Sequence, residues 1–323
     1  MGGLTDIAGL RVGHVSDYEA LTGCTVILCE GGAVAGAEIR GSASGTEEFP
    51  TMDPDHIAPQ VHGVVLAGGS AFGLEAACGV RRYLEQHGVG FQTGFARVPI
   101  VPCAILYDLG VGKANVRPTR EMGEAAAAAA SSEAVAEGAV GAGTGATVGK
   151  LFGMRQAMKS GVGSAAVSLE GPLAGVRVAA LAAVNAFGDV VDPRNGRIVA
   201  GARRAAGSRE FADTVRELKR GARGGFRGGN TTLVVVGTNA RLSKVEARKL
   251  AGLAQLGVAR TIRPVNTPYD GDVVIALSVG QEKVGLAALG EAAAEAVSEA
   301  ILRAVRLAPS LGGVPGLKDW QAG

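Results

Sequence analysis

The sequence predicts a mixed fold of the α+β class, in which strands and helices alternate along two halves of the chain and each half supplies sheet and helix layers. Short β-branched apolar runs, such as residues 25–29 and 231–238, have the length and composition of buried strands. Alanine-rich or amphipathic segments, such as residues 74–86 and 283–306, have those of helices packed on a sheet. With 323 residues, 47% of them hydrophobic, the chain can bury a large core as one domain or as two packed ones.

Turn residues and apolar runs place the elements of the first half. A Gly31-Gly32 turn predicts a hairpin, and three prolines within residues 40–60 predict a loop. In chain order, the expected segments are an arm (4–12), a strand (25–29), its hairpin partner (33–39), a strand (64–67), a helix (74–86), an apolar edge segment with prolines (98–108) and an alanine-rich helix (119–137) ended by Gly138.

The second half alternates in the same way. Ser243 and Glu246 match a capping box, so a helix is expected to begin there and to stop at Gly257. The remaining expected segments are strands over 177–184, 231–238, 259–264 and 273–278, a short helix over 211–219 and a final helix over 283–306.

Composition and charge exclude several classes of function. The formal net charge of +2 does not favour nucleic acid or an anionic membrane as a partner. The four cysteines (Cys24, Cys29, Cys78 and Cys103) form no CxxC pair, so neither a metal site nor a cofactor is expected, and reduced buried thiols are the simplest interpretation. The N-terminus has no basic-then-apolar leader, and no apolar run reaches the ~18 residues of a membrane span. We therefore expect a soluble, cytoplasmic protein.

The stretch Gly228-Gly229-Asn230-Thr231-Thr232 joins a basic, flexible loop to a buried strand. If the Asn230–Thr231 bond is cut, Thr231 carries both a hydroxyl nucleophile and a free α-amine. That amine, with a reference pKa of about 8, can activate its own hydroxyl without a histidine. The alternative is a glycine-rich hairpin or linker that simply feeds a core strand.

Two other glycine-rich segments invite nucleotide or RNA binding. Residues 141–150 lack the glycine and the Ser/Thr of a P-loop, because Thr144 and Leu151 occupy those positions. This segment is better described as a loop that lines a pocket. The basic segment 219–229 resembles an RGG sequence, but it is short and unrepeated, so nucleic-acid binding is not expected.

Three further polar groups are candidate site residues. Asn185 closes the strand over 177–184; it is either a turn residue or a hydrogen-bond donor for an oxyanion. Asp270 and Asp272 flank Gly271, and the three form either an ordinary turn or a pair of carboxylates that orients an amine and tunes its pKa.

Seven motifs in fixed order, spread over nearly the whole chain, resemble the self-processing aminopeptidases of peptidase family S58. This family includes L-aminopeptidase/D-esterases, β-peptidyl aminopeptidases and a pantetheine hydrolase. The motifs are Leu10-Arg11-Val12-Gly13-His14, Leu21-Thr22-Gly23-Cys24-Thr25-Val26, Gly68-Gly69-Ser70-Ala71-Phe72-Gly73-Leu74, Gly141-Ala142-Gly143-Thr144-Gly145-Ala146-Thr147, Val184-Asn185-Ala186-Phe187-Gly188-Asp189, Asn230-Thr231-Thr232-Leu233-Val234-Val235 and Asp270-Gly271-Asp272.

The resemblance implies a single αββα domain over 1–323, with two sheets between helical layers, an Ntn-like arrangement related to ornithine acetyltransferase. It implies self-cleavage into an α chain (1–230) and a β chain (231–323), and assembly of αβ pairs into homo-oligomers. By position, Thr231 is the nucleophile, Asn185 the oxyanion donor and Tyr107 an aromatic residue beside the substrate amine. The family's Ser-x-acid pair falls on Asp270 and Asp272, with Asp270 replacing the serine.

The expected reaction therefore has two phases. Thr231 first attacks the Asn230 carbonyl and releases the β chain; the mature enzyme then hydrolyses an amide or ester of a small, amine-bearing substrate through an acyl-enzyme. Acyl transfer to an amine acceptor, or a fold used only for binding, are the alternative functions. Strand alternation predicts that Thr231 and Thr232 point to opposite faces of the sheet, so that only one of them faces the site.

Overall fold

Nine strands form one hydrogen-bonded network in the described part of the computed structural model, which covers residues 2–223 and 229–320. Their order is β10-β11-β14-β16-β2-β4-β7-β3, and β1 pairs with β2. Their bounds are β1 Arg11–Asp17, β2 Thr22–Ile39, β3 Gly45–Glu47, β4 Val61–Ala67, β7 Cys103–Ile105, β10 Val162–Ser168, β11 Arg177–Asn185, β14 Thr231–Ala240 and β16 Val273–Glu282.

The long strand β2 joins the two halves of this network, so the hairpin expected at Gly31-Gly32 is wrong. The first part of β2 pairs with β4, from Cys24 to Leu28, and its last part pairs with β16, from Val34 to Ile39. The register shifts between these parts, and Gly32 has a φ of +84°, a value that favours glycine. The glycines therefore bend one continuous strand instead of reversing the chain.

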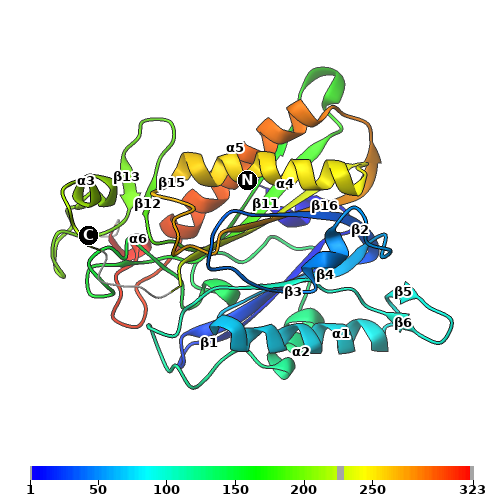
Figure 1. The fold of residues 1–323 in the computed structure, drawn as a ribbon, viewed down its shortest axis with the longest axis horizontal. Helices are drawn as coiled ribbons and strands as arrows, with labels where there is room; N and C mark the ends of the chain where they lie inside the picture. The colour runs from blue at the N-terminus through cyan, green and yellow to red at the C-terminus, as the bar shows by residue number, and fades with distance from the viewer. Residues whose placement is uncertain (1, 224–228, 321–323) are drawn as a thin grey trace.

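Helices cover both outer sides of the network (Figure 1). Helices α1 (Ala76–Gln86) and α2 (Arg120–Ala128) pack on the side of β1, β2 and β4, while α4 (Lys244–Thr261) and α5 (Leu286–Arg306) pack on the side of β10, β11 and β16. One apolar cluster lies under α4 and α5, and another lies under α1 and α2. A further cluster, which we call the inner apolar cluster, has members on β2, β4, β11, β14 and β16. It includes Ile27, Leu66, Leu181, Leu233 and Ile275. The observed architecture is thus a mixed α/β fold with helices outside and apolar strands inside.

The predicted second half is largely confirmed, with a difference at the end of α4, where the strand expected over 259–264 is shortened to β15 (Ile262–Arg263) because residues 259–261 are helical. Ser243 and Glu246 form the expected capping box. The helix continues past Gly257 to Thr261, however, because Gly257 lies at a close approach to α5 and does not end the helix. A Cβ at position 257 would stand 2.3 Å from the carbonyl oxygen of Ala294.

Helix α2 is shorter than the predicted 119–137. Ser131 exchanges both backbone hydrogen bonds with Val12 of β1, so the chain is extended where the alanine-rich composition favoured a helix. Tertiary pairing here overrides a local preference.

Several short elements lie around the ends of the network. They are η1 (Leu4–Asp6), η2 (Phe49–Met52), η3 (Ser70–Glu75), η4 (Gly141–Gly143), η5 (Gly171–Leu173), β5 (Phe91–Gln92), β6 (Arg97–Val98), β8 (Thr147–Val148), β9 (Met158–Lys159), β12 (Asp189–Val191), β13 (Ile198–Ala200), β15 (Ile262–Arg263), α3 (Thr214–Lys219) and α6 (Leu317–Trp320). Residues 224–228 of the predicted basic loop lie outside the described residues.

All four cysteines are free; Cys24, Cys29 and Cys103 are buried as expected, whereas Cys78 is exposed. Within the ranges that the structure describes, no helix is long and apolar enough to cross a membrane.

Candidate active site

Thr231 is the first residue of β14, in the middle of the strand network, where the sequence predicted a strand to begin. It is 2% exposed and lies directly opposite Asn185 in the antiparallel pair β11–β14. The predicted alternation is confirmed by the next residues: Leu233 and Val235 belong to the inner apolar cluster, and Val234 and Val236 to the cluster under α4 and α5. Thr231 and Thr232 therefore point to opposite faces.

The carbonyl of Asn230, immediately before Thr231, accepts two short hydrogen bonds. The Thr231 hydroxyl donates to it over 2.6 Å, and the Gly271 backbone N–H donates to it over 2.6 Å. Asn230 also forms a parallel bridge with Asp270, which holds this peptide beside the Asp270-Gly271-Asp272 turn. A side-chain hydroxyl and a backbone N–H thus both donate to the Asn230 carbonyl oxygen, and both polarise that carbonyl.

The Asn185 side chain is held by contacts on both of its ends. Its Nδ2 donates to the Tyr107 carbonyl over 2.9 Å, and its Oδ1 accepts from the Thr147 backbone N–H over 3.1 Å. In this uncleaved chain Gly271 is a backbone donor on the Asn230 carbonyl, while the Asn185 amide is directed to the Tyr107 carbonyl. Asn185 and Thr231 are brought together as expected.

Lys150 is a site residue that the sequence interpretation missed. Its Nζ donates to Asn185 Oδ1 over 2.7 Å and to the Asn185 carbonyl over 3.0 Å, and the residue is 1% exposed. Burial lowers the pKa of Lys150 to about 7, although the charges of Asp270 and Asp108 act in the opposite direction. The only signal in the sequence was a single lysine after nine small or apolar residues, too long an uncharged run for an ordinary solvated loop.

Asp272 contacts the residue after Thr231. Its Oδ1 accepts the Thr232 backbone N–H over 2.7 Å and its Oδ2 accepts the Asn266 N–H over 3.1 Å. Burial, and secondly the neighbouring Asp270 charge, raise the pKa of the Asp272 carboxyl. Asp272 therefore fixes the start of β14 through the residue that follows Thr231.

Asp270 is oriented by its own turn. Its Oδ2 accepts the Thr267 N–H over 2.8 Å, and burial raises its pKa while the Lys150 charge lowers it. The two aspartates are thus both near the junction but have different contacts, so their separate roles stay predictions. The turn carries at least one further function, because Gly271 between them supplies the N–H on the Asn230 carbonyl.

Tyr107 lies beside the junction on the side of Gly229. A Cβ at Gly229 would stand 3.1 Å from Tyr107 Cβ, so a side chain there would require Tyr107 to move by a few tenths of an ångström. Tyr107 is half-buried, and its carbonyl is the acceptor for the Asn185 amide. Its predicted contact with a substrate amine stays a prediction.

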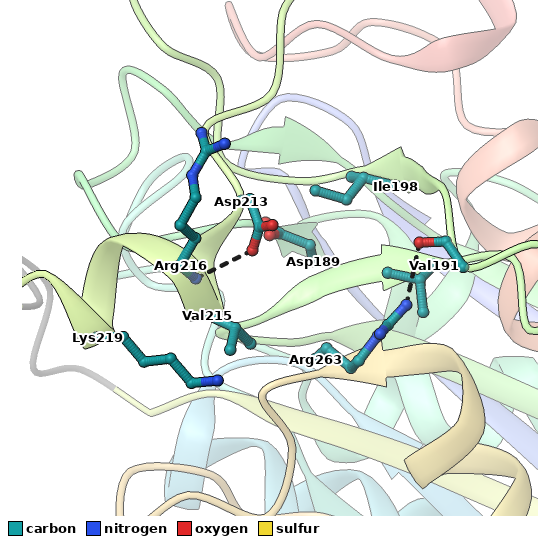
Figure 2. A pocket seen from close by; sticks show the side chains of 9 residues that line it. Asp189, Val191, Ile198, Asp213, Val215, Arg216, Lys219 and Arg263 are labelled. Carbon is teal, nitrogen blue, oxygen red and sulfur yellow. Dashed lines mark hydrogen bonds between the residues drawn. The ribbon is translucent and has the colours of Figure 1, made fainter.

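A cavity of about 330 Å³ lies beside β12, separate from these residues (Figure 2). Arg216 and Lys219 extend from α3 and Arg263 from β15, and Asp189 and Asp213 complete its charged lining. None of the predicted site residues lines it. The Thr214 N–H and hydroxyl donate to the Asp189 carboxylate at 2.7 and 2.8 Å, so this carboxylate anchors the start of α3. In the described ranges, no group of three or more His, Cys, Asp or Glu residues is arranged to hold a metal ion.

Comparisons with known proteins identify the family of the chain. Residues 3–318 match the profile of peptidase family S58. An uncharacterized aminopeptidase of Mycobacterium bovis is 39% identical, over 99% of this chain and 98% of that protein. The 6-aminohexanoate-oligomer endohydrolase of Paenarthrobacter ureafaciens is 31% identical, over 93% of this chain and 84% of that protein.

Two solved structures share the fold. One is the L-aminopeptidase D-Ala-esterase/amidase of Ochrobactrum anthropi, with a TM-score of 0.75, 21% identity and coverage of 97% of this chain and 88% of that one; its description places it among variants of the Ntn hydrolase fold. The other is a Burkholderia β-aminopeptidase, with a TM-score of 0.69, 24% identity and coverage of 98% and 90%. On the match over nearly its whole length, the chain belongs to peptidase family S58.

Proposed function

We propose that this chain is an amide hydrolase that activates itself by cleaving the Asn230–Thr231 bond and then uses Thr231 as an N-terminal nucleophile. The observation that carries the proposal is the Asn230 carbonyl, which accepts the Thr231 hydroxyl and the Gly271 N–H at 2.6 Å each. Both contacts polarise this carbonyl, which supports its role as the electrophile of an acyl transfer to the adjacent hydroxyl.

Cleavage proceeds in two steps. The Thr231 oxygen bonds to the Asn230 carbonyl carbon, the C–N bond breaks, and the hydroxyl proton passes to the released nitrogen, which leaves an ester. Water then hydrolyses the ester, giving a carboxylate on Asn230 and a free hydroxyl and α-amine on Thr231. The Gly271 N–H stabilises the developing oxyanion in the first step; such a donor typically contributes a factor of about 100–1000 in rate.

In the mature enzyme the Thr231 α-amine takes the proton of its own hydroxyl, and the hydroxyl oxygen attacks the substrate carbonyl. The amine or alcohol leaves, and water hydrolyses the acyl-enzyme. Gly271 remains a backbone donor at this place, and Asn185 becomes a second donor if cleavage releases its amide from Tyr107. Asp272 holds the start of β14, while Asp270 and Tyr107 are proposed to receive the substrate's ammonium group.

The architecture that we assign to this enzyme is the αββα sandwich, with α1 and α2 on one outside, α4 and α5 on the other, and the inner apolar cluster between two sheets that share β2. The proposed mature form is a pair of chains, 1–230 and 231–323, assembled into a homo-oligomer.

The substrate class that we propose is a small amide or ester with a free amine. Relatives named as an aminopeptidase and as a 6-aminohexanoate-oligomer endohydrolase support this class, because each name denotes an enzyme that acts on amide-linked units. The first substrates to test are thus an amino-acid p-nitroanilide and a linear 6-aminohexanoate oligomer.

Intact-mass measurement of freshly purified protein tests the proposal first. We expect two fragments, the smaller one beginning Thr-Thr-Leu-Val-Val, and one intact chain for the Thr231→Ala variant. A fragment that begins at Thr232, or a wild-type chain that stays whole and hydrolyses neither substrate, would contradict the proposal. Adding an amine acceptor to the reaction separates hydrolysis from acyl transfer by the product formed.

A further inference from the structure

Two fully buried lysines stand at the two ends of the segment from residue 150 to residue 159, and the reaction proposed above gives neither of them a role. Lys150 contacts Asn185, as described. Lys159, which is 0% exposed, donates to three backbone carbonyls: Gly143 at 3.0 Å, Ala146 at 2.8 Å and Ser160 at 2.7 Å. Burying two amines without carboxylate hydrogen bonds is costly, so their presence calls for a physical explanation.

The number of acceptors around each nitrogen distinguishes the charge states of the two lysines. Three carbonyl oxygens around Lys159 Nζ require three N–H donors, and only the ammonium form has three. Lys150 Nζ has two acceptors, both on Asn185, and a neutral amine satisfies two acceptors with its two N–H bonds. The geometry therefore favours a charged Lys159 and a neutral Lys150.

One peptide unit links Lys159 to the candidate active site. The carbonyl of Ala146 accepts from Lys159, and the N–H of the same peptide, on Thr147, donates to Asn185 Oδ1 over 3.1 Å. Because the peptide is planar, fixing its carbonyl also fixes the direction of its N–H. An ammonium on the carbonyl further polarises this peptide and strengthens the bond that its N–H makes.

We propose that Lys159 is a positioning residue that carries the single positive charge of this lysine pair, holds the Ala146–Thr147 peptide against Asn185, and keeps the Lys150 amine neutral. The inference rests on the proposed function only in giving Asn185 a catalytic role; the charge states can be measured without any reaction.

The charges around the pair admit one proton but do not assign it, because burial lowers the pKa of Lys150 to about 7 as well. The assignment to Lys159 rests on its three carbonyl acceptors. Burial lowers the pKa of Lys159 to about 7; the Asp108 charge raises that pKa and a charge on Lys150 lowers it. Lys150 faces Asp270 and Asp108 among the acids. Asp108 is itself held by the Thr22 hydroxyl and the Gly69 N–H, both at 2.7 Å. One added proton is therefore compensated, and a second one in the same buried region is opposed by like-charge repulsion.

The direct test is NMR titration of the lysine Nζ groups in the uncleaved Thr231→Ala protein, which needs no enzymatic activity. We expect Lys159 to be an ammonium below its pKa of about 7, and Lys150 to take up its proton only at lower pH than Lys159, well below the pKa of a free lysine. In the Lys159→Met variant, the pKa of Lys150 should rise by roughly one unit, the scale expected for two charges several ångströms apart in a protein interior. A Lys150 titration that is unchanged by Lys159→Met, or a Lys159 found neutral, would overturn the proposal.

A glutamine variant separates the charge of Lys159 from its hydrogen bonds. Lys159→Gln keeps two N–H donors but no charge, so it should shift the Lys150 titration as Lys159→Met is expected to do. If Lys159→Gln instead restores wild-type titration, the role of Lys159 is hydrogen bonding alone and the charge assignment is wrong.

The chain supplies a matched control in Lys244. Its Nζ also donates to three carbonyls, those of Thr51, Asp53 and His56 at 2.9, 3.0 and 3.1 Å, but at the N-terminus of α4. Lys244→Met should lower thermal stability without moving the Lys150 titration. A shift of equal size in both lysine variants would show a general effect of lost stability and would refute the specific role of Lys159.

Discussion

Replacing Lys150 with methionine should stabilise the folded chain near neutral pH while it impairs self-processing. Methionine has a similar length and no charge, so it removes the cost of burying an amine. The pKa of Lys150 falls from 10.5 to about 7 on folding. At or below pH 7 this difference of 3.5 units, at 1.36 kcal/mol per unit, corresponds to about 5 kcal/mol that the wild-type fold loses and the variant does not. At pH 9 the same calculation gives about 2 kcal/mol, and near pH 10.5 it gives nearly zero.

The substitution also removes two hydrogen bonds to Asn185, with a combined cost of roughly 1–3 kcal/mol. The variant should therefore be more stable than the parent by about 2–4 kcal/mol at pH 7 and less stable by about 1 kcal/mol near pH 10. The sign follows because, between the folded and unfolded pKa values, the unfolded parent binds a proton that the folded parent lacks, so parental stability rises with pH.

Urea unfolding at several pH values measures this difference, with Thr231→Ala as the parent so that both chains stay uncleaved. In the wild-type background the same change should slow Asn230–Thr231 cleavage, because Asn185 loses its Lys150 contact. A stability difference that does not change between pH 7 and 10 would refute the assignment of a buried, largely neutral amine. Opposite effects on stability and processing are expected of a group retained for function.

Three further outcomes are expected. Thr231→Ala should abolish both processing and turnover while Thr232→Ala still permits processing, since the two side chains face opposite sides of the sheet; equal loss in intact-mass and turnover assays would refute the assignment. Asp272→Asn should lower kcat roughly 100-fold on an amino-acid p-nitroanilide, the scale of a positioned acid–base group, whereas wild-type kinetics would reduce the carboxylate to a turn residue. Gly257→Ala should lower Tm, because its Cβ would meet a carbonyl oxygen of α5 at 2.3 Å, while Gly252→Ala in the same helix, with its nearest neighbour at 3.8 Å, should raise stability by up to about 1 kcal/mol.

The parts of the fold that the sequence predicts well are those set by local chemistry. The start of β14 at Thr231, the alternation of its side chains and the Ser243 capping box depend on neighbouring residues, and the structure has all three. The hairpin at Gly31-Gly32 is wrong because the same dipeptide suits both a turn and a bend, and only the distant partners β4 and β16 decide between them.

In the candidate site, too, local sequence indicates some residues, whereas others depend on distant contacts. Asn185, Asp270 and Asp272 were predicted from their positions next to strands and turns, and the structure places all three beside the Asn230–Thr231 junction. Lys150 was not predicted, since the acceptor that makes it a site residue lies 35 positions away. A glycine-rich sequence shows that the backbone can approach closely, but it does not show what it approaches.

The place of Thr231 in the strand network is compatible with the cleavage proposed above, because neighbouring strands hold the residues that follow the junction. Strand β14 is hydrogen-bonded to β11 on one side and to β16 on the other, and its side chains reach both apolar clusters. The Thr232 N–H is fixed by Asp272, one residue inside the junction. Breaking the Asn230–Thr231 bond removes one covalent link at the end of a strand that the two neighbouring strands and two layers of side chains still hold. If the bond is cut as proposed, the new α-amine lies at a position set by β-sheet register, opposite Asn185 and next to the Gly271 donor, so the groups proposed for acyl transfer are already held together in the uncleaved chain.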